Sequence, residues 1–212
     1  YIFFSTLIIL ILISKWKWYR LIAFLISTIF SILIILSNQN VKERVINKTL
    51  DQINLFGNKL NFFSIQHQVI YNTSYKIFLD YPIFGVGVKN FRNFCKLEQY
   101  KTYTDEDHSV DGCQTHPHNS YIQLLTETGV FGFLFVITFL YLVLKKLLLQ
   151  FYYLYFLKKR YLEDYKICFY VAILISLWPI IPTGNFFNNW LNIIYYLPIG
   201  FILSDYKFNK KN

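Results

Sequence analysis

The chain has 212 residues, 55% of them hydrophobic and 21% aromatic, and carries a formal net charge of +9. The apolar residues form long runs rather than short alternations, which excludes an ordinary soluble domain and indicates a membrane protein. The basic residues stand at the ends of these runs and form no stripe with interleaved aromatic residues, so the charge does not indicate nucleic acid as a partner.

The chain opens with two apolar runs, at residues 1–13 and 21–36. A helix needs about 20 apolar residues to cross the hydrocarbon layer. The chain contains no methionine and begins inside the first run. We therefore expect residues 1–36 to hold two transmembrane helices, the first truncated, and the chain to be a fragment whose N-terminal portion is missing.

A polar segment with nearly balanced charge follows at residues 37–118, and we predict a large, partly helical loop there. Residues 119–205 then contain three further apolar runs, at 121–144, 167–181 and 190–203.

The run at 147–157 lies between lysines and is either an interfacial helix or an extension of the preceding span. Cys168, inside the fourth span, is expected to be a small packing residue.

The basic residues predict the orientation of these five spans. If the spans alternate, the loops at 14–20 and 145–166 and the tail at 206–212 lie on one side of the membrane. Short basic loops stay in the cytoplasm, so the loop at 37–118 faces outward. The sequence thus predicts an all-α, polytopic helical membrane protein with a large extracytoplasmic loop. The basic clusters are Lys15, Lys17 and Arg20; Lys145 and Lys146; Lys158, Lys159 and Arg160; and Lys207, Lys210 and Lys211.

The outer loop carries all four histidines and two of the three cysteines. In an oxidising compartment Cys95 and Cys113 could form a disulfide that staples the loop. Alternatively Cys113 could join His108, His116 and His118 as metal ligands, since zinc uses these side chains. A disulfide would remove the thiolate from that site, and we predict no metal.

The segment DYPIFGVGVKN, residues 80–90, holds two glycines at a short spacing. Gly85 and Gly87 allow tight turns whose N–H groups could cradle an anion; a plain turn is the alternative. Lys89 and Arg92 are cations able to hold a phosphate, Arg92 in bidentate fashion; a solvated loop face is the alternative for both.

The segment THPHNSYIQLLTETGVFG, residues 115–132, opens the third span. Asn119, Gln123, Thr126 and Glu127 fall on one helical face, which must turn toward the protein interior or a water-filled cavity rather than lipid. Glu127 would lie about 12 Å along the axis from Asn119. It is either a functional residue or a buried glutamate paired for packing.

Two of these segments resemble the O-antigen ligase family. His118-Asn119, followed after nine residues by Gly129-x-x-Gly132, is similar to the family signature, and PIFGVGVKNF is similar to its glycine-containing segment. The order of spans and the hairpin PTGNFFNNW also agree with the family pattern.

The resemblance implies a GT-C-like, metal-independent, inverting glycosyltransferase without cofactors. It would transfer a glycan from a polyisoprenyl (undecaprenyl) diphosphate carrier to a hydroxyl of a lipid A core sugar, at the periplasmic face of the bacterial inner membrane. By its motif position, the resemblance implies that His118 is the catalytic base or the orienting group for the acceptor hydroxyl, with loop cations on the donor diphosphate. His116, Asn119, Gln123 and Glu127 would support this site.

One position departs from the family pattern. A Ser-Gly-Arg-like element is expected upstream of the glycine segment, but the chain has His67 at the position of the arginine. Either His67 supplies a weaker, pH-dependent cation or Arg92 takes the role with help from Lys89, and we favour Arg92.

Other functions remain open at this point. An O-antigen polymerase and a protein O-oligosaccharyltransferase share the donor chemistry. A membrane transporter is the alternative from a different class, but Glu127 is the only charged residue inside the five predicted spans, which disfavours it.

Overall fold

The structure is a computed structural model that describes residues 2–13, 15, 17–53, 63–103, 111–179 and 181–209. Within these ranges the chain is mostly helical and has no strand, only an isolated bridge between Tyr103 and Asp111. The prediction of an all-α membrane protein is confirmed. The elements are α1 (Ile2–Leu12), α2 (Lys17–Ser37), α3 (Gln39–Lys42), η1 (Glu43–Asn47), α4 (Lys48–Ile53), α5 (Ile65–Asp80), α6 (Phe91–Phe94), η2 (Glu98–Tyr100), α7 (Ser120–Tyr155), α8 (Asp164–Ser176) and α9 (Asn189–Asn209).

Among the described residues, two helices are long and apolar enough to cross a membrane: α2, from Trp18 to Ser37, and α7. Helix α8 has 13 residues. At 1.5 Å per residue it extends about 20 Å, less than the roughly 30 Å of a hydrocarbon core. The prediction of a span at 167–181 therefore overestimates the helix, which ends at Ser176, ahead of Pro179 and Pro182.

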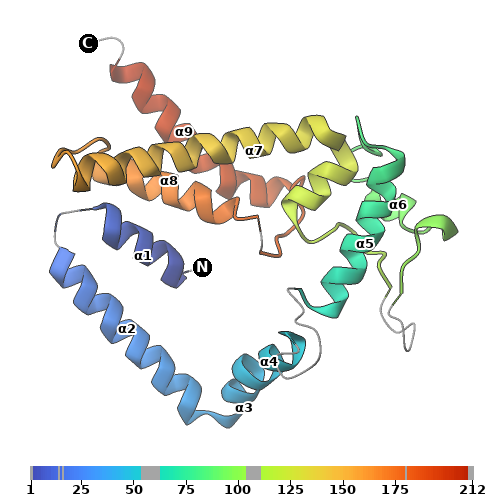
Figure 1. Cartoon of the computed structure of the whole chain (residues 1–212), viewed down its shortest axis with the longest axis horizontal. Coiled ribbons are helices and arrows are strands. Elements are labelled where there is room, and N and C mark those ends of the chain that lie inside the picture. The colour runs from blue at the N-terminus through green and yellow to red at the C-terminus, as the bar shows by residue number, and fades with distance from the viewer. Residues whose placement is uncertain are drawn as a thin grey trace.

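Helices α1, α7, α8 and α9 pack together, with α8 in contact with the other three (Figure 1). The core positions repeat at helical spacing, at Val136, Leu140 and Val143 on α7 and at Ile167, Val171 and Leu174 on α8. Each such side chain contributes about 1.5–3 kcal/mol relative to leaving it in water, although a lipid environment reduces that gain.

Helix α2 runs away from this bundle, and α3 and α4 follow it before the chain returns to α5 (Figure 1). The apolar window of α2 has no buried residue. A long apolar helix whose side chains are left largely uncovered fits a hydrocarbon environment rather than water.

The run at 147–157 belongs to α7, which continues to Tyr155, so the extension of the preceding span is the correct alternative. Residues 145–155 of the predicted cytoplasmic loop are thus helical. Cys168 lies on an exposed face of α8, so the prediction that it packs in the interior is wrong.

Candidate active site

A kink in α7 positions the outer part of the molecule. Gly129 adopts φ 68° and ψ −163°, which interrupts the helix nine residues after its start. Glycine adopts a positive φ without strain, whereas other residues lose free energy in it. The motif that ends in Gly129-x-x-Gly132 therefore needs glycine at position 129. The kink turns the short first segment of α7 toward α5 (Figure 1).

The loop with the glycine segment docks directly onto this kink. The N–H of Val130 donates to the carbonyl of Pro82 at 2.9 Å, and the N–H of Val86 donates to the carbonyl of Thr126 at 3.0 Å. The loop thus replaces a hydrogen bond that a straight helix would make between Val130 and Thr126. A Cβ atom on Gly85 would overlap the backbone of Glu127 and Thr128. The two motif segments therefore form one interlocked unit.

Glu127 is the anion that the loop binds. Its carboxylate accepts hydrogen bonds from the N–H of Lys89 at 3.0 Å and of Phe91 at 3.2 Å, while its main-chain carbonyl accepts from the N–H of Gly87 at 2.9 Å. The N–H of Gly85 donates to the carbonyl of Tyr81. Of the two alternatives for this segment, the anion cradle is wrong for the N–H groups of Gly85 and Gly87, because internal acceptors occupy both.

The predicted polar face of α7 is buried. Asn119, Gln123, Thr126 and Glu127 are each at most 3% exposed. The Gln123 amide donates to Oε2 of Glu127 at 3.0 Å and to Oδ1 of Asn185 at 2.9 Å, and its oxygen accepts from the N–H of Phe186 at 2.9 Å. Gln123 thereby joins Glu127 to the hairpin that follows α8.

The same hairpin holds the start of α7. The N–H of Thr183 donates to the carbonyl of His118 at 2.7 Å, and the hydroxyls of Ser120 and Thr183 are hydrogen-bonded at 2.9 Å. Asn119 caps the helix by accepting from the N–H groups of Tyr121 and Ile122, as its residue type favours. Its amide donates to the carbonyl of Pro179 at 2.7 Å.

Three histidines gather beside this helix start. The ring of His118 lies 4.2 Å from that of His116 and 6.0 Å from that of His67 on α5, measured between centroids. Nδ1 of His67 is hydrogen-bonded to the Ser64 hydroxyl at 2.6 Å. His118 adopts φ 56°, a conformation that costs about 1–2 kcal/mol for a residue other than glycine. Such strain persists only where the surrounding contacts fix it.

Burial keeps these histidines neutral. It lowers the pKa of His118, and burial together with the neighbouring His118 lowers the pKa of His67. Burial is also the main cause that lowers the pKa of His116 to about 4, with smaller contributions from His118 and Arg92 and an opposing one from the Thr183 backbone. A neutral imidazole can accept a proton, whereas a neutral His67 brings no positive charge to a diphosphate.

The two predicted cations differ in their surroundings. Arg92 follows the Glu127-bound N–H of Phe91 and lies close enough to His116 to influence its pKa. Lys89 adopts φ 59°, and its backbone N–H is held by Glu127. Both side chains are exposed and available to a ligand.

A disulfide joins Cys95, next to α6, to Cys113, with 5.0 Å between the Cα atoms. Cys95 is buried among Ile70, Ile77, Phe91 and Tyr100, so the bridge belongs to a second small core under the loop. The thiolate of Cys113 is therefore not available to the metal site considered with His116 and His118. His108 lies outside the described residues, and no group of three His, Cys, Asp or Glu side chains elsewhere in the described ranges could hold a metal.

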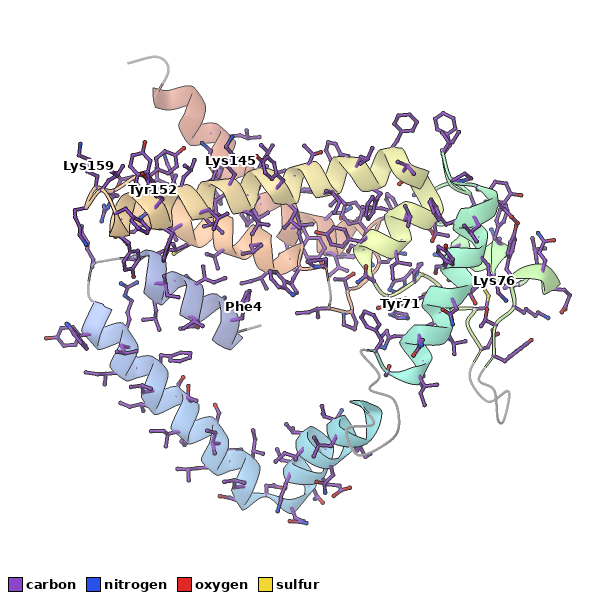
Figure 2. All side chains as sticks on the ribbon, viewed as in Figure 1. Phe4, Tyr71, Lys76, Lys145, Tyr152 and Lys159 are labelled. Atoms are coloured by element: carbon purple, nitrogen blue, oxygen red, sulfur yellow. A yellow bond between two sulfur atoms is a disulfide. The ribbon has the colours of Figure 1, made fainter. Side chains whose placement is uncertain are left out.

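Sequence reasoning missed the partners of the histidines. Ser64 and Tyr71 lie three residues before and four after His67, a spacing that predicts one helical face. Tyr71 projects from α5 (Figure 2), and burial raises its pKa to about 12 while the Asn119 side chain acts in the opposite direction. The Tyr71 hydroxyl and Nε2 of His116 are both buried and have no hydrogen-bond partner in the described part of the chain.

Fold and site together define a helical membrane protein with a polar, histidine-centred site at the start of a long apolar helix. A family model described as O-antigen ligase matches residues 1–137, which include both motif segments. No curated protein and no solved structure matches the chain significantly. The chain belongs to the O-antigen ligase family, as the motifs predict. This membership places it among membrane enzymes that transfer glycans from lipid-linked donors to glycan acceptors.

Proposed function

We propose that the protein transfers a glycan from a polyisoprenyl-diphosphate carrier to the hydroxyl of a lipid A core sugar, as an O-antigen ligase. The observation that carries the proposal is the left-handed backbone conformation of His118 at the start of a buried polar helix face, where burial lowers the pKa of its imidazole. Family membership supplies the reaction class, and the site supplies a group for each chemical requirement.

The proposed reaction needs one base and a stabilised leaving group. A nitrogen of His118 takes the proton of the acceptor hydroxyl as its oxygen attacks the anomeric carbon. The bond from that carbon to the diphosphate breaks, and the diphosphate leaves with the electron pair. Attack from the opposite face inverts the anomeric configuration. Arg92, assisted by Lys89, holds the charge of the leaving diphosphate, so the chemistry requires neither metal nor nucleotide.

The proposal includes a location and a division of the chain. Residues 1–36 and 119–205 provide the part of the protein embedded in the bacterial inner membrane, residues 37–118 form the periplasmic loop with the site, and residues 206–212 form a cytoplasmic tail. Figure 2 supports an opposed arrangement, since Lys145 and Lys159 lie at the end of α7 away from Tyr71. A lipid-borne donor would present its diphosphate at the outer membrane surface, next to such a site.

The left-handed conformation of His118 permits a sharp test of the base. In His118→Gly the imidazole is removed while the backbone strain is relieved, so the variant is expected to fold at least as well as the wild type. A positioned general base contributes about 10²–10⁴-fold, so kcat for transfer from a lipid-diphosphate donor should fall by about that factor. Added imidazole should restore part of the rate in His118→Gly, but not in the strained His118→Ala.

Near-normal turnover of His118→Gly would contradict the assignment of the base. The acceptor class is tested separately by the lipopolysaccharide of a deletion strain. Loss of all O-chains is the result expected for a ligase. Single-repeat capping would instead identify an O-antigen polymerase, and an intact profile would contradict both.

A further inference from the structure

Three alternate N–H groups of one loop converge on a single residue. The N–H groups of Gly87, Lys89 and Phe91 all donate to Glu127, the first to its main-chain carbonyl and the other two to its carboxylate. The Glu127 side chain is fully buried, and no ion pair forms with it in the described part of the chain. The carboxylate also accepts a hydrogen bond from the Gln123 amide, which is its third donor after the N–H groups of Lys89 and Phe91.

We infer that Glu127 is a positioning residue that fixes the loop backbone from which Lys89 and Arg92 reach the donor diphosphate. This inference rests on the proposed function, because it assigns those cations to the donor. The carboxylate binds the N–H of Lys89 itself and that of Phe91, the residue before Arg92. It therefore defines where both side chains leave the backbone, without touching the substrate.

The geometry explains why a carboxylate is needed. Two backbone N–H groups and one amide point at its two oxygens, which accept without offering a competing hydrogen. A glutamine would place an NH₂ group against at least one of these donors and leave a buried donor unpaired. Lys89 also has a positive φ of 59°, so its conformation depends on such contacts for support.

Glu127 also links the two parts of the site. It lies nine residues after His118 on the α7 segment that Asn119 begins, and Gln123 ties it to the hairpin whose Thr183 bonds the His118 carbonyl. The positions of the proposed base and of the proposed diphosphate cations are thus both connected to the same buried carboxylate. Displacing the loop changes donor binding, whereas His118 keeps its own contacts to the hairpin.

The direction in which Glu127→Gln changes the affinity for diphosphate distinguishes a positioning role from an effect of its negative charge alone. Removing a negative charge near two cations would strengthen the binding of a diphosphate if Glu127 acted through its field alone. Loss of positioning has the opposite effect. In the complete protein we expect Glu127→Gln to raise the donor KM about tenfold with kcat changed less than about twofold, and to weaken binding of glycan-free polyisoprenyl diphosphate by about the same tenfold factor.

A matched control lies at the far end of the same helix. Gln150 is 2% exposed and also makes three hydrogen bonds, to the carbonyl of Leu12 and from the N–H groups of Tyr161 and Leu162. Gln150→Leu should lower thermal stability while leaving donor KM and diphosphate affinity within about twofold of wild type. Glu127→Asp keeps the charge on a shorter side chain and provides the same readout if the glutamine variant does not fold.

The outcomes distinguish this inference from the proposed function. A wild-type protein that neither transfers the glycan nor binds polyisoprenyl diphosphate overturns the proposed function. A wild-type protein that does both, with Glu127→Gln matching its KM and affinity or binding the diphosphate more tightly, overturns the positioning role alone. An equal rise of KM in Gln150→Leu also overturns it, because the effect would then reflect general destabilisation.

Discussion

The two ends of α7 solve the same packing problem with different chemistry. At one end Gln150 bonds three backbone groups, one at the end of α1 and two in the loop that follows α7. At the other end the Glu127 carboxylate bonds two N–H groups of the glycine-containing loop and the Gln123 amide. A neutral amide suffices at the first end. The second end uses a buried carboxylate, a helix kink and three neutral histidines.

The difference indicates where strain serves function. Lys158 shows that a positive φ also occurs beyond the Gln150 end, but there it stands in an exposed turn. At the Glu127 end the described residues other than glycine with a positive φ are the proposed base, His118, and a proposed donor ligand, Lys89. Strain held in place by buried contacts beside ionisable groups is typical of functional sites.

Substituting Gly85 should have the largest effect on the Glu127 end of α7. In Gly85→Ala the added Cβ overlaps the backbone of α7 and the residue must keep φ 65°, so local unfolding of the loop should become about 2–5 kcal/mol more favourable and transfer should be lost. Gly200→Ala in α9 places its Cβ in open space and is the matched control. Hydrogen exchange of the loop amides measures the loss of docking.

If Gly85→Ala retained both its loop protection and its turnover, the interlocked unit would not be needed for activity. A comparable loss in Gly200→Ala would instead show that the effect does not depend on docking of the loop against α7.

How far the sequence predicted the site depends on the kind of contact. Helical spacing correctly predicted that Asn119, Gln123, Thr126 and Glu127 share one face turned away from lipid, because the helical period is a local property. The partners of Glu127 lie 36 and 38 residues away. Nothing in the local pattern specifies such a pairing, so the sequence left both an anion cradle and a plain turn open for the glycine segment.

The helices also show that the sequence predicts local properties better than those that depend on distant contacts. Hydropathy predicted the apolar runs, and α2 and α7 lie where it placed them. It did not reveal that α7 bends at Gly129, because a glycine in an apolar run is compatible with a straight helix. The exposed position of Cys168 depends on which faces of α8 its neighbours cover, which one chain position does not specify.

Opening the disulfide should have an intermediate effect, confined to the Glu127 end. The Cys95–Cys113 bridge closes a loop with a sequence separation of 18, so replacing both cysteines with alanine should cost up to about 3 kcal/mol of loop stability. Transfer should fall in proportion to the unfolded loop fraction. Cys168→Ala, on the exposed face of α8, is the control and should leave both stability and transfer unchanged.

Unchanged thermal unfolding of the double cysteine variant would show that the second small core holds the loop without the bridge. A loss of transfer in Cys168→Ala would show that transfer depends on a cysteine of α8 and is not confined to the disulfide at the Glu127 end.

Lowering the pH should have the smallest effect on folding stability, and the direction of this effect follows from the lowered pKa values of the histidines. His67, His116 and His118 bind protons less readily when folded than the ordinary value of 6.5 implies. Their contribution to stability is therefore complete above pH 6.5 and declines as the pH falls from there toward about 4, the pKa of His116. The Gln150 end has no histidine and should not respond in this range.

For catalysis, the acid limb of kcat/KM should have its midpoint below pH 6.5, since burial lowers the pKa of the proposed base His118. At pH 6.5 more than about half of that base is then neutral, so transfer should fall by less than about twofold between pH 7.5 and 6.5. A pH profile of kcat/KM in the wild type tests this. A midpoint above 6.5 would mean that the group controlling the rate is not the buried, neutral histidine that the site presents.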